Sequence, residues 1–192
     1  MGSNNPGQPS RLDQHPPART LSIVLIAVTV ALVFVTTFSF QVYIPATKGY
    51  FNFGDIMIFI VSLTFGPVVG GIAGGLGSSL SDAFSSSPQY APFTLVIKGS
   101  EGFIAGLISQ RGFSRRIAIA WSLASIEMVG GYFVAESLIL TGYPASLACI
   151  PVDILQVVAG GLVGVPASEA MRRTLPSTFR RLSFKAPKPG NS

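Results

Sequence analysis

Long apolar stretches alternate with short polar ones along this chain. The apolar stretches lie roughly at residues 21–41, 55–84, 92–110, 117–140 and 147–171. A helix needs about 20 apolar residues to cross the hydrocarbon core of a bilayer, and every stretch except 55–84 fits one crossing. The pattern predicts an all-α membrane protein.

The stretch 55–84 is too long for a single crossing. Its thirty residues would form a helix of about 45 Å at 1.5 Å per residue, whereas the hydrocarbon core is about 30 Å thick. The segment FGPVVGG, Phe65 to Gly71, supplies a break, because Pro67 disfavours helical geometry at Gly66 and glycines permit a tight reversal. We therefore expect a short helical hairpin here, and a compact bundle of six transmembrane helices in total.

Basic residues support the hairpin and predict the orientation of the chain. If 55–84 crossed only once, Arg115 and Arg116 would lie on the opposite side of the membrane from Arg11 and Arg19. With a hairpin, all basic clusters share one side, in agreement with the preference of Lys and Arg for cytoplasmic loops. We expect both termini to be cytoplasmic. The external loops then lie near 42–54, 85–91 and 141–146.

Glycines spaced four residues apart recur in the apolar stretches, as at Gly70/Gly74 and Gly102/Gly106. Membrane helices associate without a hydrophobic driving force, so small residues at this spacing let two backbones approach closely. We expect these glycines to pack the bundle rather than to bind a ligand.

Composition agrees with a membrane protein. Of the 192 residues 48% are hydrophobic and 11% are charged, whereas about 25% of the residues of a soluble domain are charged. The net charge of +5 comes from clusters in loops and tails, which argues against a face that binds nucleic acid. We expect a disordered tail at 1–19, a membrane domain at 20–172 and a basic cytoplasmic tail at 173–192. The single cysteine, Cys149, excludes an internal disulfide, and we interpret it as a small apolar filler.

Several polar and ionisable residues interrupt the predicted spans. A charged group inside a span costs about 2.5–3.5 kcal/mol on insertion scales, so it usually faces a partner or a polar cavity. Lys98 and Glu101 share a helix face, and one explanation is an ion pair that only neutralises itself. We favour a pocket that opens outward, because most of the polar positions fall in the outer halves of their spans. These positions are Lys98, Glu101, Tyr132, Glu136, Asp153 and Gln156.

Two glutamates of the fifth predicted helix fall on different faces. Glu127 and Glu136 are nine residues apart, so at 100° per residue they point in nearly opposite directions. Tyr132 lies within about 40° of Glu136 by the same arithmetic. We therefore assign Tyr132 and Glu136 to the pocket, and we expect Glu127 to pack against another helix.

The first external loop is rich in aromatic residues. Its rings at Tyr50, Phe51 and Phe53 fit two interpretations equally well. They form an interfacial aromatic belt, or they belong to a lid that combines flat rings with the amide of Asn52.

Five segments, taken in order, carry a family resemblance. They are YFNFGDIMIFIVSLTFGPVVGG, GSSLSDAF, YAPFTLVIKGSEGFIAGLI, EMVGGYFVAES and IPVDILQVVAGGLVG. Their order and spacing resemble those of the substrate-binding S components of energy-coupling factor (ECF) transporters, in particular the riboflavin-type group. The resemblance covers about residues 20–172.

The resemblance implies a multi-pass protein of the plasma membrane that captures a water-soluble vitamin or precursor from outside the cell. Such a protein works with a transmembrane coupling protein and two ATPase subunits. The resemblance implies no enzymatic activity, no cofactor and no metal. Riboflavin, a hydroxymethylpyrimidine and a pyridoxine-like ring would all suit the site.

In that family the site is built from the first loop and helices four to six. Mapped onto this chain, the resemblance implies substrate contacts from Asn52, Lys98, Glu101, Tyr132, Glu136, Asp153 and Gln156. Similar proteins often have Asn at the position of Asp153, so the charge here departs from the family pattern.

Helix one carries a row of apolar side chains. Ile23, Ala27, Ala31 and Val35 are spaced four residues apart and hence share one face. In similar S components an alanine strip of this kind docks onto the coupling protein, and helix one is not expected to contribute to the vitamin site. The other explanation is ordinary packing of Ala27 and Ala31 inside this subunit.

Two other classes of protein compete with the transporter interpretation. The intramembrane acids could serve an integral-membrane enzyme that acts on a lipid or lipid-linked substrate, or the chain could be a structural membrane subunit. The sequence has no Gly-rich phosphate loop followed by Lys-Ser or Lys-Thr, so the chain does not drive transport with ATP by itself.

Overall fold

The computed structural model describes residues 18–45, 49–110 and 113–175. Its α-helices are α1 (Ala18–Ser39), α2 (Gly54–Phe65), α3 (Pro67–Ala83), α4 (Ala91–Ser109), α5 (Phe113–Ala135), α6 (Ile150–Ala159) and α7 (Val165–Thr174). The π-helical segments η3 (Glu136–Leu140) and η5 (Gly160–Gly164) extend α5 and join α6 to α7. Short 3-10 turns, η2 (Pro88–Tyr90) and η4 (Ala145–Ala148), precede α4 and α6, and the strands β1 (Val42–Ile44) and β2 (Gly49–Phe51) link α1 to α2. Most of the two predicted tails, at 1–19 and 173–192, lies outside the described residues.

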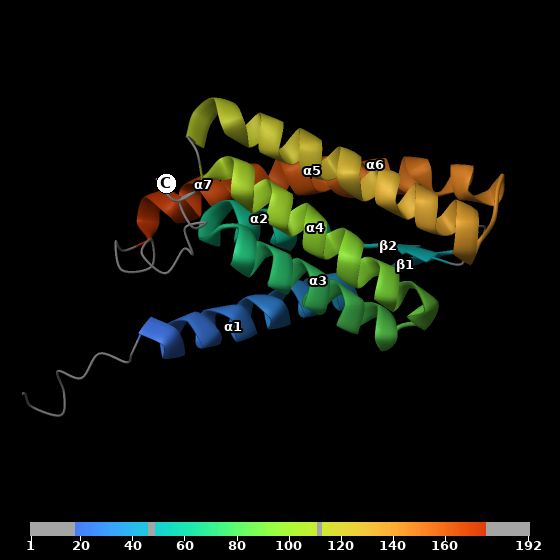
Figure 1. Cartoon of the computed structure of the whole chain (residues 1–192), viewed down its shortest axis with the longest axis horizontal. Helices are drawn as coiled ribbons and strands as arrows, with labels where there is room; N and C mark the ends of the chain where they lie inside the picture. Colours follow the sequence, from blue (N-terminus) through green and yellow to red (C-terminus); the bar gives the residue numbers. More distant parts are fainter. Residues whose placement is uncertain (1–17, 46–48, 111–112, 176–192) are drawn as a thin grey trace, which may run out of the picture.

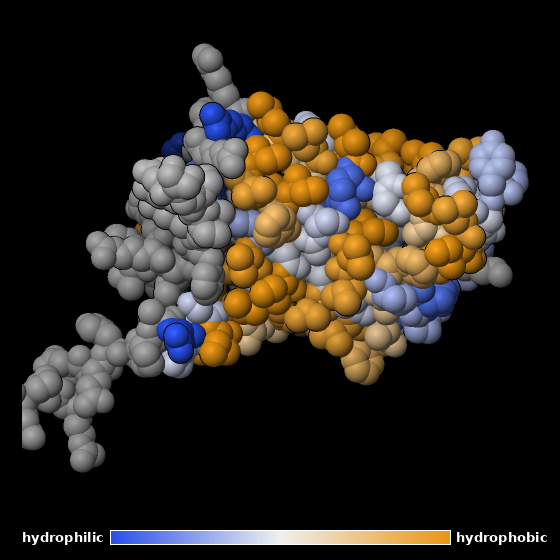
Figure 2. Space-filling model, in the orientation of Figure 1, coloured by the Kyte–Doolittle hydropathy of each residue, from blue (hydrophilic) through white to orange (hydrophobic). Residues whose placement is uncertain are grey.

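Four helical stretches in the described part of the chain are long and apolar enough to cross a membrane. They are Arg19–Ser39, Pro88–Ser109, Arg116–Leu140 and Ala145–Thr174. The remaining helices, α2 and α3, are shorter, with 12 and 17 residues. The prediction of an all-α membrane bundle is confirmed: the helices lie side by side (Figure 1), and apolar residues cover most of the side seen in Figure 2. Crossing by all six helices and cytoplasmic termini stay predictions.

The reversal expected at FGPVVGG is present. Gly66 has a φ of 93°, in the left-handed region that glycine enters without a steric penalty, and Pro67 begins α3. A Cβ atom on Gly70 would lie only 2.4 Å from the Cβ atom of Ser62, so α2 and α3 fold back on each other. They form the predicted helical hairpin.

Glycines also determine how closely α3 approaches α4 (Figure 1). A Cβ atom on Gly102 would lie 2.3 Å from the carbonyl oxygen of Gly70. One on Gly74 would lie 2.5 Å from the carbonyl oxygen of Lys98. Larger residues here would push the two backbones apart, so the glycines keep Lys98 close to the centre of the bundle.

The β1–β2 hairpin lies across one end of the bundle (Figure 1). Its strands are antiparallel, with Val42 opposite Phe51 and Tyr43 opposite Tyr50. The ring of Phe51 packs edge to face on that of Phe53, with the ring centres 5.0 Å apart. The turns η2 and η4 lie at the same end, so the loops predicted to be external gather there.

Gly102→Ala should destabilise the bundle, because its methyl group would meet the carbonyl oxygen of Gly70. Overpacking a well-packed core typically costs about 1–3 kcal/mol. We expect the variant to lose its folded fraction at a lower temperature, measured by size-exclusion chromatography after heating in detergent.

Gly130→Ala is the matched control on α5. Nothing lies within 4 Å of a Cβ atom built there, and Ala is favoured over Gly in a helix by about 0.8–1.0 kcal/mol. Equal thermal stability of the two variants would contradict the close contact between α3 and α4.

Candidate functional site

A polar cavity lies between the β1–β2 hairpin and the helix ends around it. Its empty volume is about 530 Å³, including the part that is open to solvent. Three carboxyl groups line it, those of Asp82, Glu136 and Asp153, and so do the tyrosines Tyr50, Tyr90 and Tyr132. The other polar side chains in its wall are Thr37, Asn52, Ser78, Thr94 and Gln156, and Cys149 and Val152 complete it.

Helix α6 contributes Asp153 and Gln156 to the cavity. Pro151 suits the first turn of this helix because it has no N–H to satisfy there, and the N–H of Asp153 donates to the carbonyl of Cys149 at 3.0 Å. The side chains of Asp153 and Gln156 share a helix face, and Gln156 Nε2 donates to Asp153 Oδ1 over 3.3 Å. The other oxygen of Asp153, Oδ2, is buried and has no hydrogen-bond partner among the described residues.

The loop before α2 forms one wall of the cavity. The backbone N–H of Asn52 donates to Gln156 Oε1 over 3.3 Å. The side-chain oxygen of Asn52 accepts from the N–H of Gly54 at 2.7 Å, where α2 begins. Asn52 therefore joins the loop, α2 and α6 at the edge of the cavity.

Tyr50 of β2 points inward and donates a hydrogen bond to Asp82 at the end of α3. Burial and the negative charge of Asp82 raise the pKa of the Tyr50 hydroxyl above its usual value, so the hydroxyl stays protonated at neutral pH. One aromatic residue of the predicted belt or lid is thus part of the cavity wall.

Two further tyrosines connect η2 and α4 with α5 and η3. The hydroxyls of Tyr132 and Thr94 are 2.8 Å apart, and Tyr90 donates to Glu136 Oε1 over 3.4 Å. Glu136 is the first residue of η3, and π-helical segments within α-helices often mark functional sites. The second oxygen of Glu136 is buried without a hydrogen-bond partner among the described residues.

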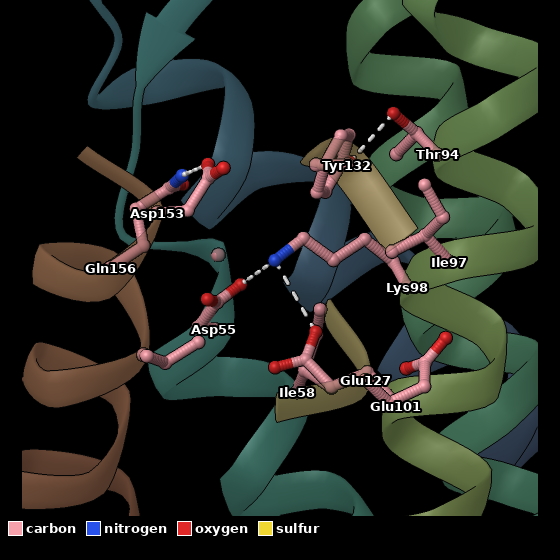
Figure 3. A network of polar contacts seen from close by, with 12 residues as sticks. Asp55, Ile58, Thr94, Ile97, Lys98, Glu101, Glu127, Tyr132, Asp153 and Gln156 are labelled. Carbon is pink, nitrogen blue, oxygen red and sulfur yellow. Dashed lines mark hydrogen bonds and ion pairs between the residues drawn. The ribbon is translucent and has the colours of Figure 1, made fainter. Parts of the chain in front are cut away.

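Lys98 lies beside the cavity and does not line it. Its Nζ extends from α4 to Asp55 on α2 and lies 3.2 Å from Oε2 of Glu101 (Figure 3). All three side chains are at most 3% exposed. The same Nζ is 5.7 Å from the centre of the Tyr132 ring, which forms part of the cavity wall. The ammonium group thus joins two buried carboxyl groups directly behind the site.

Glu127 is not part of the cavity wall. It accepts a hydrogen bond from Ser100 Oγ of α4 at 2.5 Å. Glu127 thus packs α5 against α4, as its helix face predicted.

Five of the seven residues predicted from the family resemblance line the cavity. They are Asn52, Tyr132, Glu136, Asp153 and Gln156, whereas Lys98 and Glu101 lie behind the wall with Asp55. Their role in ligand binding stays a prediction.

The structure also adds residues to the wall that were not among the seven predicted contacts. Each of two added residues had one signal in the sequence. Asp82 is a carboxyl group near the end of a predicted helix, and Tyr50 is an aromatic residue in the first external loop. Cys149, interpreted as an apolar filler, is buried in the wall. Thr37 of α1 lines the cavity as well. The expectation that helix one does not contribute to the vitamin site stays a prediction.

Comparison with known proteins finds a family and two relatives. A family model described as ECF-type riboflavin transporter, S component, matches residues 18–173. A protein of Pyrococcus woesei, described as an uncharacterized protein in gap 3′ region, is 47% identical over 131 residues, which are 68% of this chain and 87% of that protein. The thiamine precursor transporter HmpT of Lactococcus lactis subsp. cremoris (strain MG1363) is 30% identical over 153 residues, 79% of this chain and 88% of that protein.

Lys98→Met should destabilise the protein, because it leaves the carboxyl groups of Asp55 and Glu101 buried without their cation. Removing one partner of a buried ion pair costs about 3–5 kcal/mol. We expect a lower midpoint of thermal unfolding in detergent.

The double variant Lys98→Met/Asp55→Asn removes one of the two carboxyl groups left without a cation. It should recover part of the thermal stability that Lys98→Met loses. Glu127→Gln is the control, since an amide oxygen still accepts from Ser100. A double variant no more stable than Lys98→Met would argue against the pairing of Lys98 with Asp55.

Proposed function

The chain belongs to the family of ECF-type riboflavin transporter S components, and from this premise we propose that it binds a water-soluble vitamin or vitamin precursor in its polar cavity. The family resemblance seen in the sequence motifs is confirmed. We propose that the chain is a multi-pass protein of the plasma membrane with the β1–β2 hairpin on the external side. The cavity then takes its ligand from outside the cell.

The observation that carries the proposal is the convergence of polar and aromatic side chains on one cavity at the hairpin end. Small-molecule sites combine ring-bearing walls with a few placed polar groups that orient the ligand. Here three tyrosine rings stand beside carboxyl, amide and hydroxyl groups. The relative from Lactococcus lactis is named a thiamine precursor transporter, which supports a vitamin precursor as the ligand class.

Riboflavin, a pyrimidine and a pyridoxine-type ring are the candidate ligands. Mass spectrometry of small molecules released from the purified protein tests the proposal directly. Release of a vitamin or precursor supports it. A purified protein that turns over a lipid and binds none of these rings would favour an enzyme instead.

Gln156→Ala should weaken ligand binding at least tenfold, equivalent to about 1.4 kcal/mol. The change removes a polar group from the cavity and also the acceptor for the N–H of Asn52, which holds the loop at the cavity edge. Titration of the purified protein with the released vitamin measures the effect. Glu127→Gln, outside the cavity, should keep the affinity of the unmodified protein. Equal ligand affinities of the two variants would contradict a role of Gln156 in ligand binding.

The proposed transport cycle depends on partners that supply ATP-driven coupling, an ECF transmembrane coupling protein and two ATPase subunits. A surface on α1 is suited to the coupling protein. Ile23 and Val35 are 68% and 55% exposed, and Ala27 and Ala31 between them are exposed as well. Packing of the two alanines inside this subunit therefore does not explain the row. Small side chains leave space for a helix of another protein to approach closely.

Ala27→Trp and Ala31→Trp should block assembly with the coupling protein, because an indole would separate the two helix surfaces. We expect co-purification with the coupling protein and vitamin uptake by cells to be lost, while the purified variant keeps its ligand affinity. Ile126→Trp on α5, at a residue that is 68% exposed, is the matched control and should assemble normally. Normal assembly of both alanine variants would rule out this row as the docking surface.

A further inference from the structure

We propose that the ligand of the cavity is a cation, a nitrogen heterocycle that carries a positive charge on its ring or on an attached ammonium group. This inference rests on the proposed function and adds the charge of the ligand. Its basis is the balance of charges in the interior of the bundle, together with carboxyl oxygens in the cavity wall that lack a partner.

The buried charged groups are strongly biased toward acids. Among the described residues, five carboxyl groups and one ammonium group are buried. The acids are Asp55, Asp82, Glu101, Glu136 and Asp153, and the ammonium group is that of Lys98. A charge removed from water is tolerated when an opposite charge or several hydrogen bonds compensate it. Lys98 is the charged partner of only two of them, Asp55 and Glu101.

The one buried cation in the described part of the chain is already engaged behind the cavity. Lys98 pairs with Asp55 and with Glu101, which places its charge between two acids. Neutral groups donate the hydrogen bonds that the structure gives to the three carboxyl groups in the cavity wall. Tyr50 donates to Asp82, Tyr90 donates to Glu136, and Gln156 donates to Asp153. None of the described residues that line the cavity is Lys, Arg or His.

Two wall carboxyl groups have an oxygen free for a ligand. Asp153 is 7% exposed and Glu136 is 4% exposed, and each has one buried oxygen with no hydrogen-bond partner among the described residues. Both residues line the cavity. A buried acceptor left without a donor costs free energy, and a charged N–H donor on the ligand would satisfy it with one of the stronger kinds of hydrogen bond.

The ring residues of the wall favour the same charge. Tyr50, Tyr90 and Tyr132 line the cavity, and tyrosine rings attract cations through their π faces. An anionic vitamin phosphate would instead meet three acids of its own sign. A neutral ring would offer no charged donor to the unpartnered oxygens of Glu136 and Asp153.

The test compares two pairs of ligands that differ in charge, and the first pair also shares its shape. Pyridoxamine and pyridoxine have the same ring, and the former carries an ammonium group where the latter has a hydroxyl. Thiamine, a cation, and riboflavin, which is neutral, form a second pair. We expect the purified protein to bind at least one cationic member ten times more tightly than its neutral counterpart, in titrations at pH 7.

Asp153→Asn provides the second arm, because the amide keeps the shape of the side chain and removes its charge. The variant should bind the preferred cation at least tenfold more weakly and lose most of the preference over the neutral partner. Glu127→Gln should keep both affinities. Thermal unfolding in detergent checks that all variants are folded.

The outcomes separate this inference from the proposed function. A neutral vitamin that binds as well as or better than its cationic counterpart, with equal affinity in Asp153→Asn, would overturn the charge assignment and leave vitamin binding intact. Release of a neutral or anionic vitamin from the purified protein would do the same. If no vitamin is released and none of the four probes binds, the inference and the proposed function fail together.

Discussion

The ion pairs of Lys98 with Asp55 and Glu101 fix the relative positions of α2 and α4 behind the cavity. They fix the start of α2 against α4, and Asn52 lies only three residues before Asp55. Through Asn52 the same position controls the loop that contacts Gln156 on α6. An unpaired carboxyl group at this depth would be strongly disfavoured, so the ammonium group makes the buried start of α2 possible.

The close helix contacts and the ion pairs depend on each other. Lys98 reaches Asp55 because the glycines of α3 bring α4 near, as the 2.5 Å between a Cβ built on Gly74 and the Lys98 carbonyl oxygen indicates. In membranes, van der Waals packing and interhelical polar contacts replace the hydrophobic effect as the forces between helices. The bundle combines both in the space between α2, α3 and α4.

The apolar pattern predicted the helices well, because span length and hydropathy are local properties. Gly66 and Pro67 likewise revealed the hairpin, since their backbone preferences act at their own positions. The short strands were not predicted, because three residues are too few for a periodic signal. For the site, the helix face of Glu136 and Tyr132 was readable from spacing. The partner of Lys98 was not, since Asp55 is 43 residues away and only tertiary packing brings them together.

The short length of α2 has a consequence for how the chain enters the bilayer. Its 12 residues extend about 18 Å at 1.5 Å per residue, well short of the roughly 30 Å hydrocarbon core. An isolated segment of this length is a poor substrate for the insertion machinery, and Asp55 at its start weakens it further. A helix this short would enter a bilayer more readily together with α3, as one hairpin closed at Gly66.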